Sequence, residues 1–331
     1  MRDLTEYKQR LEEILAKSKN VMITMSSPDG DSIGSSLALK DILYQLNINA
    51  DIICSFDLGG RFDNYTGSSN IIVADIGRTD FSRYDAVFTL DAGQLARLVR
   101  GELYPEGFHF PKNIEVINID HHESNDNFGT LNVNITDASC TAEVMDALFD
   151  GKYDMDSFMA TLMFFSVVYD TGNFRFNATE HLFDFAAKCS RNGANNEEVI
   201  NDFYNNRSLA QTKYEAVLLS RMIQEKNYIY TFAYHDDMEK YGIDVAKYLS
   251  ATATIARDYL SSYQDADFGW VLSERKHDIV KIEMRGKIED TPILEITKSL
   301  GGGGHKKACG AKVMNKSVEE VNHDILEHLK N

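Results

Sequence analysis

Short apolar runs alternate with amphipathic segments in the first half of the chain. Residues 5–19 place their apolar side chains on one helical face and charged residues elsewhere, which predicts an amphipathic helix. Short apolar strands alternating with helical segments are typical of a parallel sheet with crossover helices, in which ligands bind at the carboxyl ends of the strands. The expected strands are residues 20–25, 49–54, 85–91 and 114–120, and further helices are expected at 32–46, 141–149 and 157–169.

The second half of the chain has a different pattern, in which apolar and polar positions alternate. Residues 197–224 are helical with breaks and connect the two halves. We therefore expect a first domain at 1–190, a helical linker at 191–225 and a second domain at 226–331. In the second domain we expect strands at 227–235, 267–275 and 278–286, a helix at 292–300 before a glycine run, and a last helix at 317–329 that opens with a capping box.

The composition indicates an acidic globular protein. Hydrophobic residues make up 43% and aromatic residues 11% of the 331 residues, which is enough for a packed core and excludes a disordered or fibrous chain. The 34 lysines and arginines are outnumbered by 51 aspartates and glutamates, which gives a formal net charge of −17. Such a surface repels nucleic-acid duplexes and anionic lipid, since both bind clustered basic side chains. A phosphate group must therefore be held locally, by metal ions or by a small basic pocket.

The cysteines and the start of the chain indicate the compartment. The four cysteines are scattered, without the spacing of a zinc knuckle or a disulfide framework. The first residues are charged throughout and lack the apolar region of a signal peptide. No stretch contains the ~18 apolar residues of a membrane-spanning helix. We therefore expect a cytoplasmic protein with no membrane partner.

Carboxylates and histidines follow several of the expected strands. Asp29 and Asp31 flank Gly30, which would let the backbone turn tightly so that both carboxylates reach inward. The other carboxylates each end an apolar run, and one of them is followed directly by two histidines. The candidate residues are Asp29, Asp31, Asp91, Asp120, His121, His122 and Asp170.

Carboxylates mixed with imidazoles are suitable ligands for Mn²⁺, with Mg²⁺, Co²⁺ or Fe²⁺ as related choices. Two ions ~3.5–4 Å apart could share one aspartate, activate a water molecule and hold the oxygens of a phosphoryl group. Each motif alone has a simpler interpretation: Asp-Gly-Asp is commonly a turn, a strand-end aspartate a helix N-cap, and a glycine run a flexible loop. Their occurrence together favours the metal site.

The order of these motifs resembles the DHH phosphoesterase superfamily. More narrowly, the chain is similar to its bacterial oligoribonuclease (nanoRNase) and pAp-phosphatase branch. That resemblance implies an α/β protein of two lobes, namely a parallel-sheet, Rossmann-like DHH domain and a smaller α/β DHH-associated domain, with the active site in the cleft between them. The glycine-rich motif separates the chain from family II inorganic pyrophosphatases. The motifs are PDGDSIGSSLAL, TLD, IDHH, YDTGNFRF and GGGGHKKACG.

The resemblance also implies roles for the candidate residues. One metal position would use Asp29 and Asp91, and the second would use Asp31, His121 and Asp170 together with the bridging Asp91. The catalytic pair would be Asp120, which orients His121, and His122, which lies toward the substrate phosphate. In the second domain the remote end of the substrate would be held by Arg285, by the backbone N–H groups of Gly301, Gly302, Gly303 and Gly304, and by His305.

One position departs from the family pattern, which has a histidine four residues before the first aspartate. Counting back from Asp29 leads to Met25, and a thioether is a poor ligand for Mn²⁺ or Mg²⁺. We therefore expect the first metal position to be weak, completed by a different ligand, or empty; Ser26, Ser27 or solvent could partly compensate.

The implied function is hydrolysis of short oligoribonucleotides and of linear dinucleotides of the pApA or pGpG type to nucleoside 5′-monophosphates. The same site could also remove the 3′-phosphate of pAp. The expected partners are short single-stranded RNA or DNA and no long duplex, and the resemblance is compatible with a homodimer. An alternative, motivated by Met25, is a nucleotide-binding or sensing protein with weakened catalysis. A processive exonuclease is disfavoured by the acidic charge.

Overall fold

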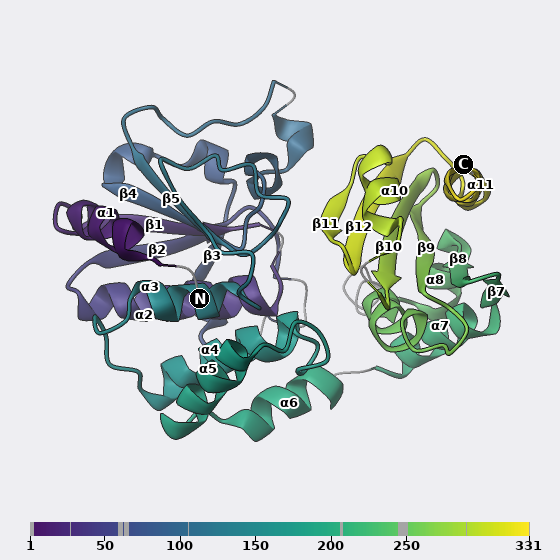
Figure 1. Ribbon diagram of the computed structural model, residues 1–331. Coiled ribbons are helices and arrows are strands. Elements are labelled where there is room, and N and C mark those ends of the chain that lie inside the picture. The colour runs from purple at the N-terminus through teal and green to yellow at the C-terminus, as the bar shows by residue number, and fades with distance from the viewer. Residues whose placement is uncertain are drawn as a thin grey trace. The chain divides into compact units, whose positions relative to one another are not determined.

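The chain folds into two compact units, Met1–Asn206 and Arg207–Asn331. The computed structural model (Figure 1) describes residues 3–330 except 27, 59–61, 63–65, 105, 206–207, 244–250 and 289. The segment 191–225, expected as a helical linker, is divided between the units: the helix Asn196–Asn205 belongs to the first and the helix Leu209–Ser220 to the second. No helix among the described residues is both long and apolar enough to cross a membrane.

The first unit contains a six-stranded sheet whose order is β3-β2-β1-β4-β5-β6. Every pairing in it is parallel, so the predicted parallel sheet is confirmed. The central strands are buried along nearly their whole length, which explains why they are continuous apolar runs in the sequence. The strands are β1 (Asn20–Met25), β2 (Asn49–Cys54), β3 (Ile71–Val73), β4 (Ala86–Leu90), β5 (Glu115–Asp120) and β6 (Leu131–Asn134).

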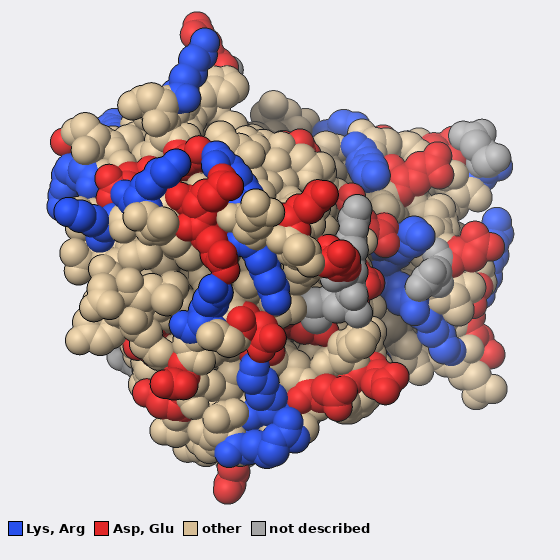
Figure 2. Space-filling view, turned by 60° about the vertical axis from the view of Figure 1, so that its left-hand side comes forward, with Lys and Arg blue, Asp and Glu red and all other residues tan. Residues whose placement is uncertain are grey.

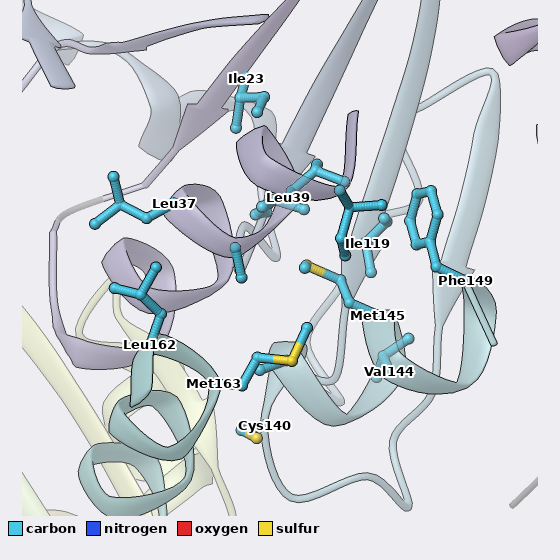
Figure 3. Close-up of a cluster of buried hydrophobic side chains, with 14 of the residues drawn as sticks. Ile23, Leu37, Leu39, Ile119, Cys140, Val144, Met145, Phe149, Leu162 and Met163 are labelled. Atoms are coloured by element: carbon cyan, nitrogen blue, oxygen red, sulfur yellow. The ribbon is translucent and has the colours of Figure 1, made fainter. Parts of the chain in front are cut away.

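Helices pack against the sheet of the first unit. One face of the sheet packs on α2, α3 and α4, where Leu37, Leu39, Met145 and Met163 are among the buried side chains (Figure 3). The α-helices are α1 (Thr5–Leu15), α2 (Gly30–Gln45), α3 (Thr141–Leu148), α4 (Ser157–Asp170), α5 (Glu180–Arg191) and α6 (Asn196–Asn205). Short 3₁₀ helices are η1 (Ser68–Asn70), η2 (Ile76–Arg78), η3 (Phe81–Arg83), η4 (Leu95–Leu98) and η5 (Gly101–Leu103).

The second unit contains a mixed sheet of order β11-β12-β10-β9-β8-β7. Its described pairings are antiparallel except for the parallel pair β8–β9. Hydrophobic clusters pack on both faces of this sheet, one with α10 and α11 and one with α7 and α8. The elements are α7 (Leu209–Ser220), β7 (Ile223–Glu225), β8 (Tyr228–Ala233), α8 (His235–Tyr241), the π-helix η6 (Ala256–Leu260), β9 (Phe268–Lys276), β10 (Ile279–Gly286), α10 (Ile293–Ser299), β11 (Gly303–His305), β12 (Ala308–Met314) and α11 (Val318–His328).

Candidate metal centre

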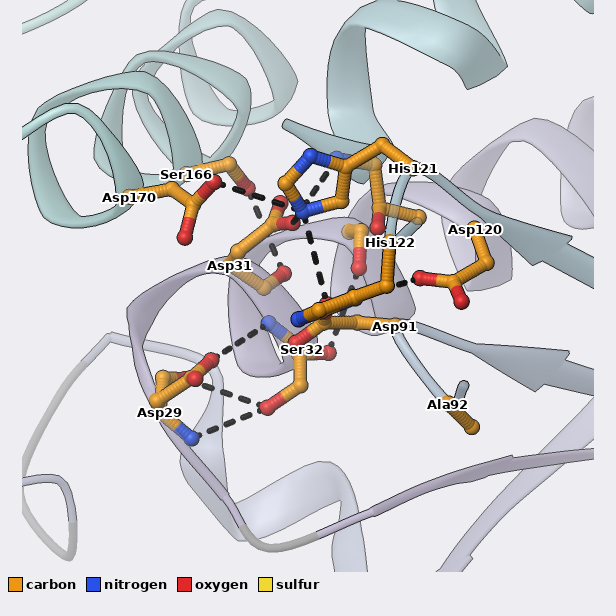
Figure 4. A network of polar contacts seen from close by, with 12 residues as sticks. Asp29, Asp31, Ser32, Asp91, Ala92, Asp120, His121, His122, Ser166 and Asp170 are labelled. Atoms are coloured by element: carbon orange, nitrogen blue, oxygen red, sulfur yellow. Dashed lines mark hydrogen bonds and ion pairs between the residues drawn. The ribbon is translucent and has the colours of Figure 1, made fainter. Parts of the chain in front are cut away.

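The predicted acidic and histidine residues of the first unit gather at the carboxyl ends of adjacent strands (Figure 4). This follows from the strand order, because β1, β4 and β5 are neighbours in one parallel sheet. Asp29 is the N-cap of α2 directly after β1, Asp31 lies in its first turn, and Asp91 follows β4. The two histidines follow Asp120 at the end of β5, and Asp170 is the last residue of α4.

Asp91 is held by its backbone. Its φ of 51° is in the left-handed region, which a non-glycine residue rarely adopts. The Ser26 hydroxyl donates to the Asp91 carbonyl at 2.8 Å, and the Asp91 N–H donates to the carbonyl of Ile119 at 3.1 Å. The buried Oδ1 of Asp91 accepts no hydrogen bond from the described residues. A buried carboxylate oxygen in that situation is a good ligand for a cation.

The imidazole of His121 is surrounded by three carboxylates. Its Nε2 lies 3.3 Å from Oδ2 of Asp170, 3.7 Å from Oδ2 of Asp31 and 3.7 Å from Oδ1 of Asp91. Burial by itself would lower the pKa of His121, but these carboxylates raise it well above its ordinary value. Only 1% of the His121 side chain is exposed, so little solvent screens these charges.

The carboxylates of this cluster resist ionisation in the absence of a cation. Burial, followed by the charges of Asp91 and Asp170, raises the pKa of Asp31 well above its ordinary value. Burial and the charge of Asp29 raise the pKa of Asp91 to about 7. The described ion pairs of Asp31, Asp91 and Asp170 all involve histidine rather than lysine or arginine. The cluster therefore has a deficit of positive charge.

Asp31 is also fixed by the N-terminus of α3. Its Oδ2 accepts from the N–H of Thr141 at 2.7 Å and its Oδ1 from the N–H of Ala142 at 3.4 Å. The first N–H groups of a helix have no partner within the helix and favour a negative charge. Helix α3 therefore orients this carboxylate and partly offsets its burial.

Asp120 contacts a different histidine from the one expected. Its Oδ1 lies 2.7 Å from Nδ1 of His122, and its Oδ2 accepts from Asn125 at 2.6 Å. The side chains of consecutive residues diverge at the end of the strand, so this bond orients His122, and the expected role of Asp120 toward His121 stays a prediction. Burial would raise the pKa of Asp120, but the hydrogen bond with His122 lowers it. Burial would lower the pKa of His122, but Asp120 raises it.

Two donor sets in this unit fit a divalent cation. Within each set the ligand atoms lie within 4.8 Å of one another. Oxygen and imidazole donors without thiolates suit Mn²⁺, Mg²⁺ or Fe²⁺. The excess of negative charge and the oxygen of Asp91 that accepts no hydrogen bond from the described residues are the features that a cation would satisfy. The sets are Asp31, His121 and Asp170, and Asp91, Asp120, His121 and His122.

The position predicted to be weak lies beside these sets. Asp29 accepts a hydrogen bond from the N–H of Ser32 at 3.0 Å as a helix cap, and its charge acts on Asp91. Met25 is fully buried in the hydrophobic core of the unit. Of the two serines expected to compensate, Ser26 is bonded to the Asp91 carbonyl, and Ser27 lies outside the described residues. Among the described residues, neither donor set of this unit includes Asp29.

The glycine run of the second unit closes a helix and begins a strand instead of forming a loop. The N–H groups of Gly301 and Gly302 donate to the carbonyls of Lys298 and Thr297, at 3.0 and 2.8 Å, and so close the end of α10. The expectation that these two N–H groups face an anion is therefore wrong, because the helix end uses them. Gly303, Gly304 and His305 form β11, which pairs with β12.

The residue predicted to hold the remote end of the substrate, Arg285, lies on β10 opposite Ala308 and Gly269 of the neighbouring strands. On the same face, Glu283 is 7% exposed and binds Lys281 at 2.7 Å and Thr252 at 3.0 Å. This charged row was not among the site residues predicted from the sequence. Its signal is the alternation of charged and apolar residues along β10, which places the charged ones on one face.

Residues 20–166 match the family model described as DHH family, N-terminal domain. The chain is 24% identical over 300 residues to the bifunctional oligoribonuclease and PAP phosphatase NrnA of Bacillus subtilis, covering 86% of each chain. It is 28% identical over 318 residues to the protein of the same name from Thermus thermophilus, covering 93% of this chain and 88% of that protein.

Solved structures give the same result for the fold. An exopolyphosphatase-related protein from Bacteroides fragilis matches with a TM-score of 0.84 at 20% identity, covering 98% of this chain and 96% of that one. RecJ in complex with Mn²⁺ from Thermus thermophilus matches with a TM-score of 0.51 at 14% identity, and the chain spans 54% of its length. The family model and the curated relatives confirm the resemblance drawn from the sequence motifs.

Proposed function

Because residues 20–166 match the family model described as DHH family, N-terminal domain, we propose that the chain is a metal-dependent hydrolase that cleaves short oligoribonucleotides and linear dinucleotides to nucleoside 5′-monophosphates. The observation that carries the proposal is the set of three carboxylates around Nε2 of His121, at 3.3 to 3.7 Å. The similar proteins named as bifunctional oligoribonuclease and PAP phosphatase support the substrate class. They also support removal of the 3′-phosphate of pAp by the same site.

The first unit would hold the cation and the scissile phosphate. Asp31, His121 and Asp170, together with Asp91, would hold one Mn²⁺, and Asp29 with Asp91 would hold a second, weaker one. When bound, such an ion lowers the pKa of a water molecule and stabilises charge on the phosphate oxygens.

His122 would act on the leaving group. Its Nδ1 is bonded to Asp120 at 2.7 Å, so the bond fixes the ring and leaves Nε2 as the proton donor to the departing oxygen. Burial would lower the pKa of His122, but Asp120 raises it, which favours the protonated ring. Asp120 is in turn held by Asn125.

The second unit would recognise the remote phosphate of the substrate. Arg285 offers a planar guanidinium suited to phosphate, and a side chain at Gly303 would meet nothing within 4 Å, so the backbone there is accessible. Gly304 and His305 continue the same strand, and Gly301 and Gly302 would contribute by closing α10 rather than by direct contact. Recognition of a phosphate at a fixed place favours short substrates.

The surface charge supports short rather than long nucleic acids. On the face shown in Figure 2, the lysine and arginine side chains of the described residues are interspersed with aspartate and glutamate rather than forming a continuous basic band. A long strand requires contacts with many phosphates and would bind with a steep salt dependence.

The test is product analysis with the full chain. Linear pApA and pGpG, pAp, RNAs of two to five nucleotides and a long single-stranded RNA are incubated with Mn²⁺, Mg²⁺, Co²⁺ or Fe²⁺ in turn. Nucleoside 5′-monophosphates from the short substrates support the proposal. Cleavage of the long RNA with the short substrates left intact contradicts it.

A second candidate is a nucleotide-binding protein with weakened catalysis, which the burial of Met25 in the core favours. Under that function the same dinucleotides bind, as measured by calorimetry, but none of the four metals supports turnover. Turnover with any of them excludes it.

A further inference from the structure

Gly30 lies between Asp29 and Asp31, where a neighbouring side chain leaves no room for a Cβ atom. Its φ is not in the left-handed region, and it is the first residue of α2, so the expectation that a tight turn requires glycine there is wrong. A Cβ built on Gly30 would lie 2.1 Å from Cγ and 2.3 Å from Cβ of Tyr169. The tyrosine side chain therefore packs directly on the backbone between the two aspartates.

The same close approach continues one turn along α2. A Cβ on Gly34 would lie 2.5 Å from the carbonyl oxygen of Leu162 and 2.6 Å from Oγ of Ser166. The Ser166 hydroxyl in turn donates to the carbonyl of Asp31 at 3.4 Å. The backbone of α2 thus lies directly against α4 at Gly30 and Gly34. Any shift of one helix relative to the other would move the aspartates at the start of α2.

The position of Tyr169 is fixed on its other sides. Its hydroxyl donates to Oδ2 of Asp202 on α6 at 2.5 Å. Its ring centroid lies 4.3 Å from that of Phe165, 5.2 Å from that of Phe203 and 5.6 Å from that of Phe62. Rings in such contact have little freedom to rotate. The ring is therefore a rigid spacer between α2, α4 and α6.

We infer that Tyr169 is a positioning residue for the cation site. Its side chain sets the loop of Asp29 and Asp31, and its backbone is joined to Asp170, whose Oδ2 is 3.3 Å from Nε2 of His121. One residue thus fixes the spacing between carboxylates that come from α2 and from the end of α4. The inference rests on the proposed function, since it assumes that these carboxylates bind a divalent cation.

The experiment measures Mn²⁺ affinity of the full chain by calorimetry and by the electron paramagnetic resonance of free Mn²⁺, without substrate. Tyr169→Leu, which removes the ring, should weaken binding about 10- to 100-fold, as do losses of groups that orient metal ligands. Tyr169→Phe keeps the ring and loses the bond to Asp202, so it should weaken binding about fivefold. Asp202→Asn should match Tyr169→Phe.

The matched control is Tyr153→Phe. Tyr153 also donates to an aspartate at 2.5 Å, Asp146 on α3, but lies away from the candidate ligands. It should lower the melting temperature about as much as Tyr169→Phe and leave Mn²⁺ affinity unchanged. Gly30→Ala should lower the melting temperature sharply, and the double variant Gly30→Ala/Tyr169→Leu should not recover it, because leucine keeps the Cβ and Cγ atoms that the added methyl group would meet.

The possible failures are distinguishable. Wild-type protein that binds no Mn²⁺ at millimolar concentration contradicts the cation site and therefore the proposed function as well. Wild type that binds Mn²⁺ while folded Tyr169→Leu binds it equally well overturns the positioning role alone. An equal loss of affinity in Tyr153→Phe and Tyr169→Phe also overturns it, because the effect would then follow general stability.

Discussion

Two buried carboxylates, one in each unit, respond to burial in opposite ways. Asp91 is 5% exposed and Glu283 is 7% exposed. Burial and the charge of Asp29 raise the pKa of Asp91 to about 7. Burial would also raise the pKa of Glu283, but Lys281 and Arg285 lower it below its ordinary value. The difference therefore comes from the neighbours and not from the degree of burial.

This comparison indicates what each site can bind. The cluster around Asp91 has several carboxylates and only imidazoles to offset them, so a divalent cation would stabilise it. Glu283 lies in a row with the basic side chains of Lys281 and Arg285. These three side chains together carry one net positive charge. These charges support the proposal that an anion such as a phosphate binds at the second site and a metal at the first.

The largest effect is expected for Asp91→Ala, which tests the proposed cation site of the first unit. Loss of the carboxylate shared by both proposed cation positions should reduce turnover by a factor on the order of 10³ or more at saturating Mn²⁺. The fold should survive, because a strand-end site contributes little to the core. Turnover and near-ultraviolet circular dichroism are measured beside Asp150→Ala, an exposed aspartate of the same unit. Retention of more than a few percent of turnover contradicts the shared ligand.

In the second unit the corresponding change is Arg285→Ala. Loss of one charged contact with the remote phosphate should raise KM for 5′-phosphorylated dinucleotides about 10- to 100-fold. kcat and Mn²⁺ affinity should change much less, because the scissile phosphate is held by the other unit. Steady-state kinetics are compared with Arg275→Ala on β9, and His305→Ala should behave like Arg285→Ala with a smaller effect. A fall in kcat with KM unchanged is incompatible with this role.

The pH dependence of Mn²⁺ binding tests the raised pKa values at the first site. Cation binding requires loss of the protons that the raised pKa values of Asp91 and His121 retain. The affinity should therefore rise between about pH 5.5 and 8, by up to about tenfold per pH unit for each proton released. Calorimetry in buffers of different ionisation enthalpy measures the proton release directly. A pH-independent affinity contradicts the raised pKa values.

Stability without metal should follow the opposite trend. A carboxyl group whose pKa is raised on folding binds more protons in the folded than in the unfolded state between its ordinary pKa of 3.8 and about 7. The contribution of Asp91 to the free energy of unfolding of the metal-free protein should therefore fall as the pH rises through this range. Thermal unfolding with and without Mn²⁺ should diverge as the pH rises.

Met25→His tests whether the first cation position lacks a ligand. An added imidazole should lower the Mn²⁺ concentration required for activity about tenfold, an effect of the size seen for groups around metal sites. The purified wild type should contain one tightly bound metal ion per chain, measured by elemental analysis. Met22→His is the control, because Met22 is equally buried but belongs to the hydrophobic cluster on the other side of the sheet. Two fully occupied ions in wild type, or no shift in Met25→His, contradict the prediction.

The smallest expected effect concerns Glu283→Gln. The substitution keeps the shape but leaves Lys281 and Arg285 without their counter-charge, and Lys281 is 29% exposed and therefore partly screened. The free energy of unfolding at pH 7 should fall by about 1–2 kcal/mol. Since the pKa of Glu283 is lowered on folding, its contribution is present above its ordinary pKa of 4.5 and is lost as the pH falls through the folded value. Chemical denaturation should therefore give a smaller difference near pH 4 than at pH 7.

Much of the fold of the first unit could be predicted from the sequence. The run Asn20–Met25 is β1 as expected, and the expected strand at 114–120 is β5 within one residue. These segments are predictable because a strand buried on both faces needs a continuous apolar run. Helix α5 and the edge strands β3 and β6 were not predicted. Edge strands are short and partly exposed, so their composition resembles that of loops.

The sequence alone indicates which chemical groups gather at the site. Which of these groups contact one another is seen only in the tertiary structure. The alternation of strands and helices predicts a parallel sheet, whose strands end at one edge, so the grouping of Asp31, Asp91 and His121 could be anticipated. The bond of Asp120 to His122 and the packing of Tyr169 on Gly30 could not. Both depend on side-chain directions and on the distance between elements far apart in the chain, and these are set by packing of the whole unit rather than by local periodicity.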